Sequence, residues 1–117
     1  LSEYQPRSHS LRRLVEGNAL ETLRAVAKQG PVASAPFCMI LTIDVQRMVP
    51  RCGDRAERYS LLESGHIAQN VLLQATALGL ASVPVGGVDE AKISMTMKLP
   101  AGLRPVYLLP IGHAKRN

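Results

Sequence analysis

The sequence predicts a mixture of helices and strands, of the α/β or α+β class. Three observations lead to this prediction: a nearly continuous apolar run at 37–45, a proline-free stretch with helical periodicity at 55–80, and a shorter apolar run at 106–111. Shorter segments around them complete the order β-β-α-β-α-β-α-β.

The composition limits the class of protein. With 117 residues, 1–117 is expected to be a single domain or part of one, and 46% hydrophobic residues exclude a disordered chain. Aromatic residues make up only 3%, which argues against a module that stacks nucleic-acid bases. The net charge of +5 is spread along the chain and allows a phosphate-bearing ligand. We therefore expect no nucleic-acid partner.

The cysteines and the apolar runs bear on location. Cys38 lies in an apolar run and Cys52 in a polar one, and two such cysteines do not form a disulfide framework. No apolar run approaches the roughly 18 residues of a membrane span, and no secretory signal is visible. We expect a cytoplasmic protein with no membrane partner. Because the chain begins at Leu1 rather than at methionine, we also expect a fragment or a processed product.

The first third of the chain predicts two short strands and a helix. Residues 1–17 form extended pieces around a turn at 5–10. A helix follows over 18–29, because Asn18 and Glu21 have the spacing of a capping box. Gly30 and Pro31 are expected to end it, as a C-terminal glycine followed by a breaker.

The middle third predicts a strand, a loop and a long helix. The run 37–45 has the apolar character of a buried central strand, and 49–54 is expected to be a loop. From Arg55 to Leu80 the pattern is helical. Small and apolar residues share one stripe of this helix. They are Leu61, Gly65, Ala68, Leu72, Ala75 and Gly79. A second, polar stripe holds Tyr59, Glu63, His66 and Asn70.

The last third predicts two strands with a helix between them. Residues 81–85 form a short strand, and Asp89 caps a helix that continues to about Met97. After a loop at 100–105, the run 106–111 is a strand that Pro110 would place at an edge.

Two side-chain groups raise the question of catalysis. Cys52 has Arg51 and Arg55 nearby, which could lower the pKa of its thiol, although an ordinary loop cysteine explains it as well. Glu63 and His66 have the helical spacing of a metal-binding pair, but the chain contains no second such pair. We therefore expect no metal site.

The stretch "PVGGVDE" at 84–90 contains two adjacent glycines. It matches neither a dinucleotide fingerprint nor a phosphate-binding loop, so a simple turn is one interpretation. The other is that a ligand approaches the backbone closely here, because a glycine has no Cβ.

The sequence resembles the C-terminal part of nitroreductase-family flavoproteins. "RYSLLESGHIAQNVLLQATALGLASVPVGGVDEAKI" at 58–93 and "RPVYLLPIGH" at 104–113 carry the resemblance. It implies an α+β fold, a mixed sheet flanked by helices with a long central helix, and it implies that the family's N-terminal part is missing here. It also implies a homodimer formed through the helix at Arg55–Leu80, in whose core the small-residue stripe would pack.

The same resemblance implies bound FMN and a place for it. The segment matching Pro84, Val85, Gly86 and Gly87 lies along the flavin ring in the family, with backbone groups near its N5 and O4 edge. Lys115 or Arg116 would match a basic residue that completes the phosphate site.

The preceding "GDRAERY" at 53–59 is most similar to the subfamily that oxidises azolines to thiazoles and oxazoles. That subfamily has a lysine–tyrosine pair where this chain has Arg51 and Cys52. A guanidinium group is no general base at neutral pH, and a thiol is not a phenol.

Two functions remain. The first is an FMN-dependent oxidoreductase that passes hydride between a reduced nicotinamide, NAD(P)H, or an organic substrate and flavin N5. The second is a non-catalytic, truncated nitroreductase-like fragment that serves as a dimerisation or binding module.

Overall fold

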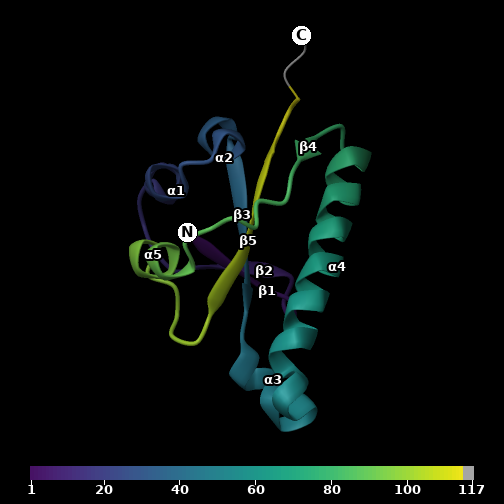
Figure 1. The fold of residues 1–117 in the computed structure, drawn as a ribbon. Coiled ribbons are helices and arrows are strands. Elements are labelled where there is room, and N and C mark those ends of the chain that lie inside the picture. The colour runs from purple at the N-terminus through teal and green to yellow at the C-terminus, as the bar shows by residue number, and fades with distance from the viewer. Residues whose placement is uncertain (115–117) are drawn as a thin grey trace.

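A computed structural model of the chain describes residues 1–114. In order, the elements are β1 (Ser2–Gln5), β2 (Ser10–Arg13), α1 (Ala19–Ala27), α2 (Gly30–Ser34), β3 (Phe37–Ile43), α3 (Val45–Cys52), the 3-10 turn η1 (Gly53–Arg55), α4 (Ala56–Ala77), β4 (Ala81–Ser82), α5 (Glu90–Thr96) and β5 (Arg104–Gly112). β1 and β2 form a hairpin, and the antiparallel order of the other strands is β3-β5-β4. Helix α4 lies on one side of this sheet, and α1, α2 and α5 lie on the other (Figure 1).

The predicted ends of three helices are confirmed. The side chain of Asn18 accepts a hydrogen bond from the Glu21 N–H, and that of Asp89 accepts one from the Lys92 N–H at 3.0 Å. At the end of α4, Gly79 has a φ of 71°. Two N–H groups at this end donate hydrogen bonds to carbonyls of the last helical turn, Gly79 to Thr76 and Leu80 to Ala75. This pattern is a Schellman motif.

The expected role of Gly30 and Pro31 as a helix end is wrong. Helix α1 ends earlier, at Lys28, which has a left-handed φ of 50°. Gly30 and Pro31 instead begin the short helix α2. A proline is tolerated there because the first N–H groups of a helix have no intrahelical partner.

The expected loop at 49–54 is also wrong, because α3 and η1 occupy it. Helix α3 forms because Asp44 caps it: its carboxylate accepts from the Arg47 N–H at 3.1 Å. Pro50 lies inside α3, and the helix ends two residues later. The missing N–H of this proline therefore costs a single hydrogen bond near the end of the helix.

The predicted places of the two main strands are reversed. β5 is the central strand and β3 is an edge strand of the described sheet. Pro110 pairs with Cys38 of β3, and on the other side of β5 the ladder with β4 is interrupted between the pairs Ser82–Ile111 and Val85–Leu108. A proline is tolerated beside such an interruption, where no ladder hydrogen bond is formed.

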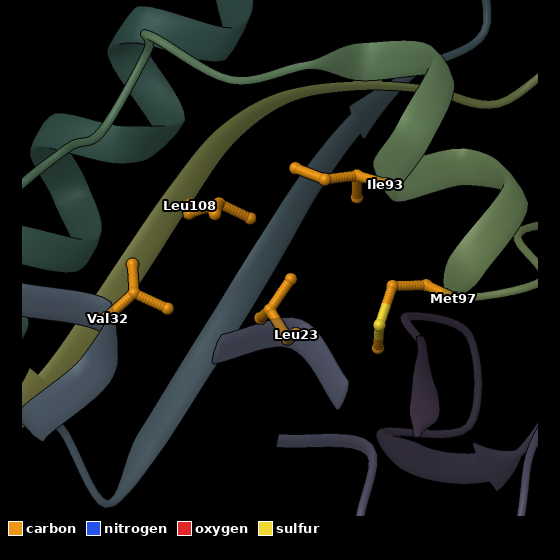
Figure 2. Close-up of a cluster of buried hydrophobic side chains, with 5 residues drawn as sticks. All are labelled: Leu23, Val32, Ile93, Met97 and Leu108. Carbon is orange, nitrogen blue, oxygen red and sulfur yellow. The ribbon is translucent and has the colours of Figure 1, made fainter. Parts of the chain in front are cut away.

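A buried apolar cluster joins the sheet to the helices on one side of it. It contains Leu23 of α1, Val32 of α2, Ile93 of α5, Met97 at the C-cap of α5, and Leu108 of β5. Figure 2 shows these side chains pointing into one space. Leu108 and Val32 are fully buried. This cluster holds α5 against β5. It therefore also fixes the C-terminal end of the segment that connects Val85 to α5.

The small-residue face of α4 packs on the sheet. Its buried residues are Ala56, Ser60, Ser64, Ala68 and Ala75, and α4 contacts β3, β4 and β5. Leu61, expected on the same stripe, is 42% exposed. Because small residues allow close approach, this face serves the contact with the sheet. This differs from the expectation that the small residues face a second copy.

The polar stripe is as expected, since Tyr59, Glu63, His66 and Asn70 are all exposed. Among the described residues, no helix has both the length and the apolar character needed to cross a bilayer.

Candidate functional site

The segment 84–87 is attached to the central strand. Val85 exchanges two backbone hydrogen bonds with Leu108, at 2.8 and 3.0 Å. Past Val85 the chain leaves the sheet and leads into α5 (Figure 1). Because Leu108 is fully buried, the start of the glycine pair has a fixed anchor in the core. The glycines themselves are exposed.

The two glycines have different surroundings. A Cβ on Gly86 would lie 3.2 Å from Cε1 of Tyr107, so the backbone rests on this ring. A Cβ on Gly87 would meet no atom within 4 Å. Neither residue has the left-handed φ that favours glycine. Within the described residues, therefore, neither packing nor backbone conformation requires a glycine at 87.

The hydrogen bonds of this segment leave two donors free. The Val88 N–H donates to the Gly86 carbonyl at 3.0 Å, and the Gly87 carbonyl accepts from the side chain of Gln29 at 3.4 Å. The N–H groups of Gly86 and Gly87 donate to no group in residues 1–114. Adjacent free N–H groups on an exposed backbone form a small site for an acceptor with partial negative charge.

The predicted basic residues, Lys115 and Arg116, lie outside the described residues. The chain leads toward them from the end of β5. There, a groove of about 310 Å³ opens between α2 and the strands β4 and β5. Its lining includes Ser34, Ser82 and His113.

An ion-pair bridge holds the helices that flank the site. Arg104, at the start of β5, bonds through Nη1 to Glu57 Oε1 at 2.7 Å, and its Nε lies 3.0 Å from Glu90 Oε2. The hydrogen bond to Glu57 is the main cause that raises the pKa of Arg104, against an opposing effect of burial. This one side chain ties the first turns of α4 and α5 to the central strand.

The other candidate groups lie on separate elements: Cys52 ends α3, Cys38 is in β3, and Glu63 and His66 are on α4. Burial raises the pKa of Cys38 to about 11, although a backbone hydrogen bond at Leu109 lowers it in part. Its thiol is therefore protonated at neutral pH, which removes its value as a nucleophile. Glu63 and His66 are exposed on α4. No group of three or more metal-ligating residues exists within 1–114.

Sequence reasoning located the glycine pair but not its neighbours. Tyr107 and Gln29 contact the pair from β5 and from the junction of α1 and α2. Gln29 is 58 positions from Gly87. No local pattern marks either residue, because each reaches the pair only through the fold.

A comparison with protein-family models decides the family. The model of the nitroreductase family matches residues 3–113. The chain belongs to the nitroreductase family. Its α+β fold is nitroreductase-like, with the long central helix α4.

Individual nitroreductase relatives agree with this. A protein of Methanocaldococcus jannaschii, provisionally named a nitroreductase, is 37% identical over 94% of this chain and 55% of its own length. A crystal structure of a Ralstonia eutropha protein with the same provisional name has a TM-score of 0.84 at 24% identity, over 99% of this chain and 54% of that one.

A third relative is the Vibrio harveyi NADPH:FMN oxidoreductase, solved in complex with NAD⁺. It has a TM-score of 0.66 at 28% identity, over 83% of this chain and 46% of that one. This nitroreductase-family chain thus spans about half the length of these relatives.

Proposed function

We propose that this chain forms the part of an FMN-dependent oxidoreductase that contacts the redox edge of the flavin. The observation that carries the proposal is the pair of free N–H groups at Gly86 and Gly87. FMN fits this segment in two respects: the backbone offers donors, and a Cβ at Gly87 would occupy open space that a flat ring needs. When bound, FMN would supply the hydride acceptor.

The residues of the chain have separable roles in this proposal. Val85 fixes the segment through its two hydrogen bonds to Leu108. Tyr107 lies behind Gly86 and limits how far that backbone can retreat. The two N–H groups would stabilise negative charge at the reduced ring, since donors held in place need no reorganisation when charge develops. Lys115 and Arg116 remain our candidates for the phosphate.

Membership of the family supports proposals for the electron donor and for the assembly. Nitroreductase-family members usually bind FMN and are typically homodimers that use NAD(P)H, and the Vibrio harveyi relative bears NADPH in its name. We propose NAD(P)H or a small organic substrate as hydride donor here. We also propose a homodimer formed through α4. Exposed apolar side chains on the helix and at its C-cap support this: Leu61, Leu62, Ile67, Leu73 and, at the C-cap, Leu78.

The narrower assignment to the azoline-oxidising subfamily rests on 53–59 alone. Arg51 and Cys52 stand in place of the lysine and tyrosine, on the last turn of α3. We therefore propose the general oxidoreductase activity rather than azole formation. Both cysteines are free thiols, which fits the reducing cytoplasm in which we place the protein.

One observation favours the second candidate function, a non-catalytic dimerisation or binding module. Helix α4 carries exposed apolar side chains that a partner could cover without any cofactor, among them Leu62, Ile67 and Leu73. The module would keep the apolar surface of α4 and lose the cofactor.

FMN uptake separates the two functions. The protein is mixed with excess FMN, passed through a desalting column and examined for flavin absorption. If it carries FMN, NADPH under nitrogen should then bleach the absorption. Retained flavin in stoichiometric amount supports the oxidoreductase. A protein that leaves the column without flavin, while sedimenting as a dimer, supports the module and refutes our first proposal.

A further inference from the structure

Gln29 occupies a helix N-cap without capping its helix. It is the N-cap residue of α2, with extended backbone angles of −105° and 130°, and its side chain makes no capping hydrogen bond. Serine, threonine, aspartate and asparagine are the usual residues at this position. The side chain of Gln29 instead crosses to the glycine pair, where Nε2 donates to the Gly87 carbonyl oxygen at 3.4 Å.

The backbone of Gln29 is held on both sides. Before it, Lys28 ends α1 and donates its N–H to the Arg24 carbonyl. After it, Pro31 stiffens the first turn of α2, and the Ala33 N–H donates to the Gln29 carbonyl at 2.9 Å. Gln29 itself is half-buried. The side chain therefore starts from a fixed point, which limits the positions that its amide can take.

The hydrogen bond from Gln29 begins a chain of polarised peptide groups. The peptide that contains the Gly87 carbonyl also contains the Val88 N–H, which donates to the Gly86 carbonyl at 3.0 Å. The peptide that contains the Gly86 carbonyl also contains the Gly87 N–H, which is one of the two free donors. Each hydrogen bond in such a chain strengthens the next, by about 10–30% per bond.

We infer that Gln29 is a positioning residue that orients the Gly87 N–H and makes it a stronger donor. The Gln29 side-chain amide lies at one end of this series of hydrogen-bonded peptide groups, and the free Gly87 N–H lies at the other end. This inference rests on the proposed function for its purpose, since a stronger Gly87 donor favours a ligand that carries negative charge. The Gln29–Gly87 contact itself is a property of the protein without ligand.

The first test uses the protein without FMN. Gln29→Leu keeps the approximate size of the side chain and removes its donor. In nitrogen–proton correlation spectra, the amide signals of Gly87 and Val88 should shift, and the Gly87 proton should move upfield as its peptide loses polarisation. Gln74→Leu, on the exposed side of α4, is the matched control and should leave both signals in place. Gln29→Lys supplies a new donor and should reverse part of the shift.

The second test measures FMN. Gln29→Leu removes the hydrogen bond to the Gly87 carbonyl, and this loss should weaken FMN binding by about two- to fivefold. The reduced flavin should lose more affinity than the oxidised flavin, so the midpoint potential of the bound flavin should become more negative. A purely structural role would weaken both forms equally and leave the potential unchanged.

The outcomes are distinct. Gly87 and Val88 signals that shift no more in Gln29→Leu than in Gln74→Leu would overturn the inference, as would an unchanged potential. If the signals shift as expected but the wild-type protein takes up no FMN, the positioning role of Gln29 stands and the proposed function is wrong.

Discussion

Gly86 lies directly against Tyr107, so that a Cβ on the glycine would come within 3.2 Å of Cε1. Its neighbour Gly87 faces open space in the described residues. The two glycines are thus chemically alike and structurally different. A substitution at one tests packing, and the same substitution at the other tests the ligand.

Gly87→Ala should separate stability from binding. The φ of Gly87 lies outside the left-handed region, and an added methyl meets nothing. The free energy of unfolding should stay constant or rise by about 0.4–1 kcal/mol, because alanine lowers the entropy of the unfolded chain. FMN affinity should fall, and Gly87→Leu should abolish uptake. Chemical denaturation and flavin fluorescence measure the two effects.

Gly86→Ala is the matched comparison. Its methyl would press on Tyr107, so this variant should be less stable than the wild type and should also bind FMN poorly. Our placement of the ring is wrong if Gly87→Leu binds FMN as tightly as the wild type.

Removing the bridge at Arg104 should loosen both helices that it joins. Arg104→Met keeps the aliphatic stem and deletes the contacts with Glu57 and Glu90. Because all three side chains are partly exposed, we expect a loss of only about 1 kcal/mol in the free energy of unfolding. The difference from wild type should shrink in concentrated salt, as screening weakens the bridge. Arg58→Met, with no ion pair in the described residues, should have little effect.

Cys38 should make stability depend on alkaline pH. In the unfolded chain the thiol ionises near its reference pKa of 9.0, whereas in the folded protein it stays protonated up to about 11. Between these values the unfolded state releases a proton that the folded state keeps, so the free energy of unfolding falls as pH rises through this window. Cys38→Ala should show a shallower fall between pH 9 and 11. Equal slopes for both proteins in denaturation at each pH would contradict this prediction.

A charge on the outer side of α4 should disrupt the proposed dimer. Leu73 is 60% exposed, and Leu73→Lys places a strong helix former at the same position. We expect sedimentation analysis to show a monomer with unchanged helix content. Met95→Lys, at a residue 76% exposed on α5, is the control and should remain dimeric. If both Leu73→Lys and Leu62→Lys remain dimeric, the interface does not lie on this side of α4.

Local signals allowed the sequence to predict helix ends. Asn18, Asp89 and Gly79 each act on residues within four positions, so their roles follow from spacing alone. Strand order depends on distant residues. By the usual rule, Pro110 indicates an edge strand, yet it lies in the central strand β5. A proline is tolerated there because the pairing of β5 with the segment 81–85 is interrupted at Val83 and Pro84.

The candidate site also combines a local signal, which the sequence shows, with contacts between distant residues, which it does not show. The sequence shows two adjacent glycines, which are compatible with a simple turn or with the close approach of a ligand. What each glycine approaches was not visible, because Tyr107 and Gln29 come from elements far along the chain. The structural difference between Gly86 and Gly87 therefore emerges only from the folded protein.

The central position of β5 sets the order in which this sheet can be made. Both β3 and β4 pair with β5, the last of the described strands, and not with each other. A ribosome adds about 5–20 residues per second, so β3 and α4 leave it before β5, the strand that both contact in the described residues. Among the described strands, β3 and β4 have no partner other than β5. The three-stranded sheet of the described residues can therefore close only once β5 has been made.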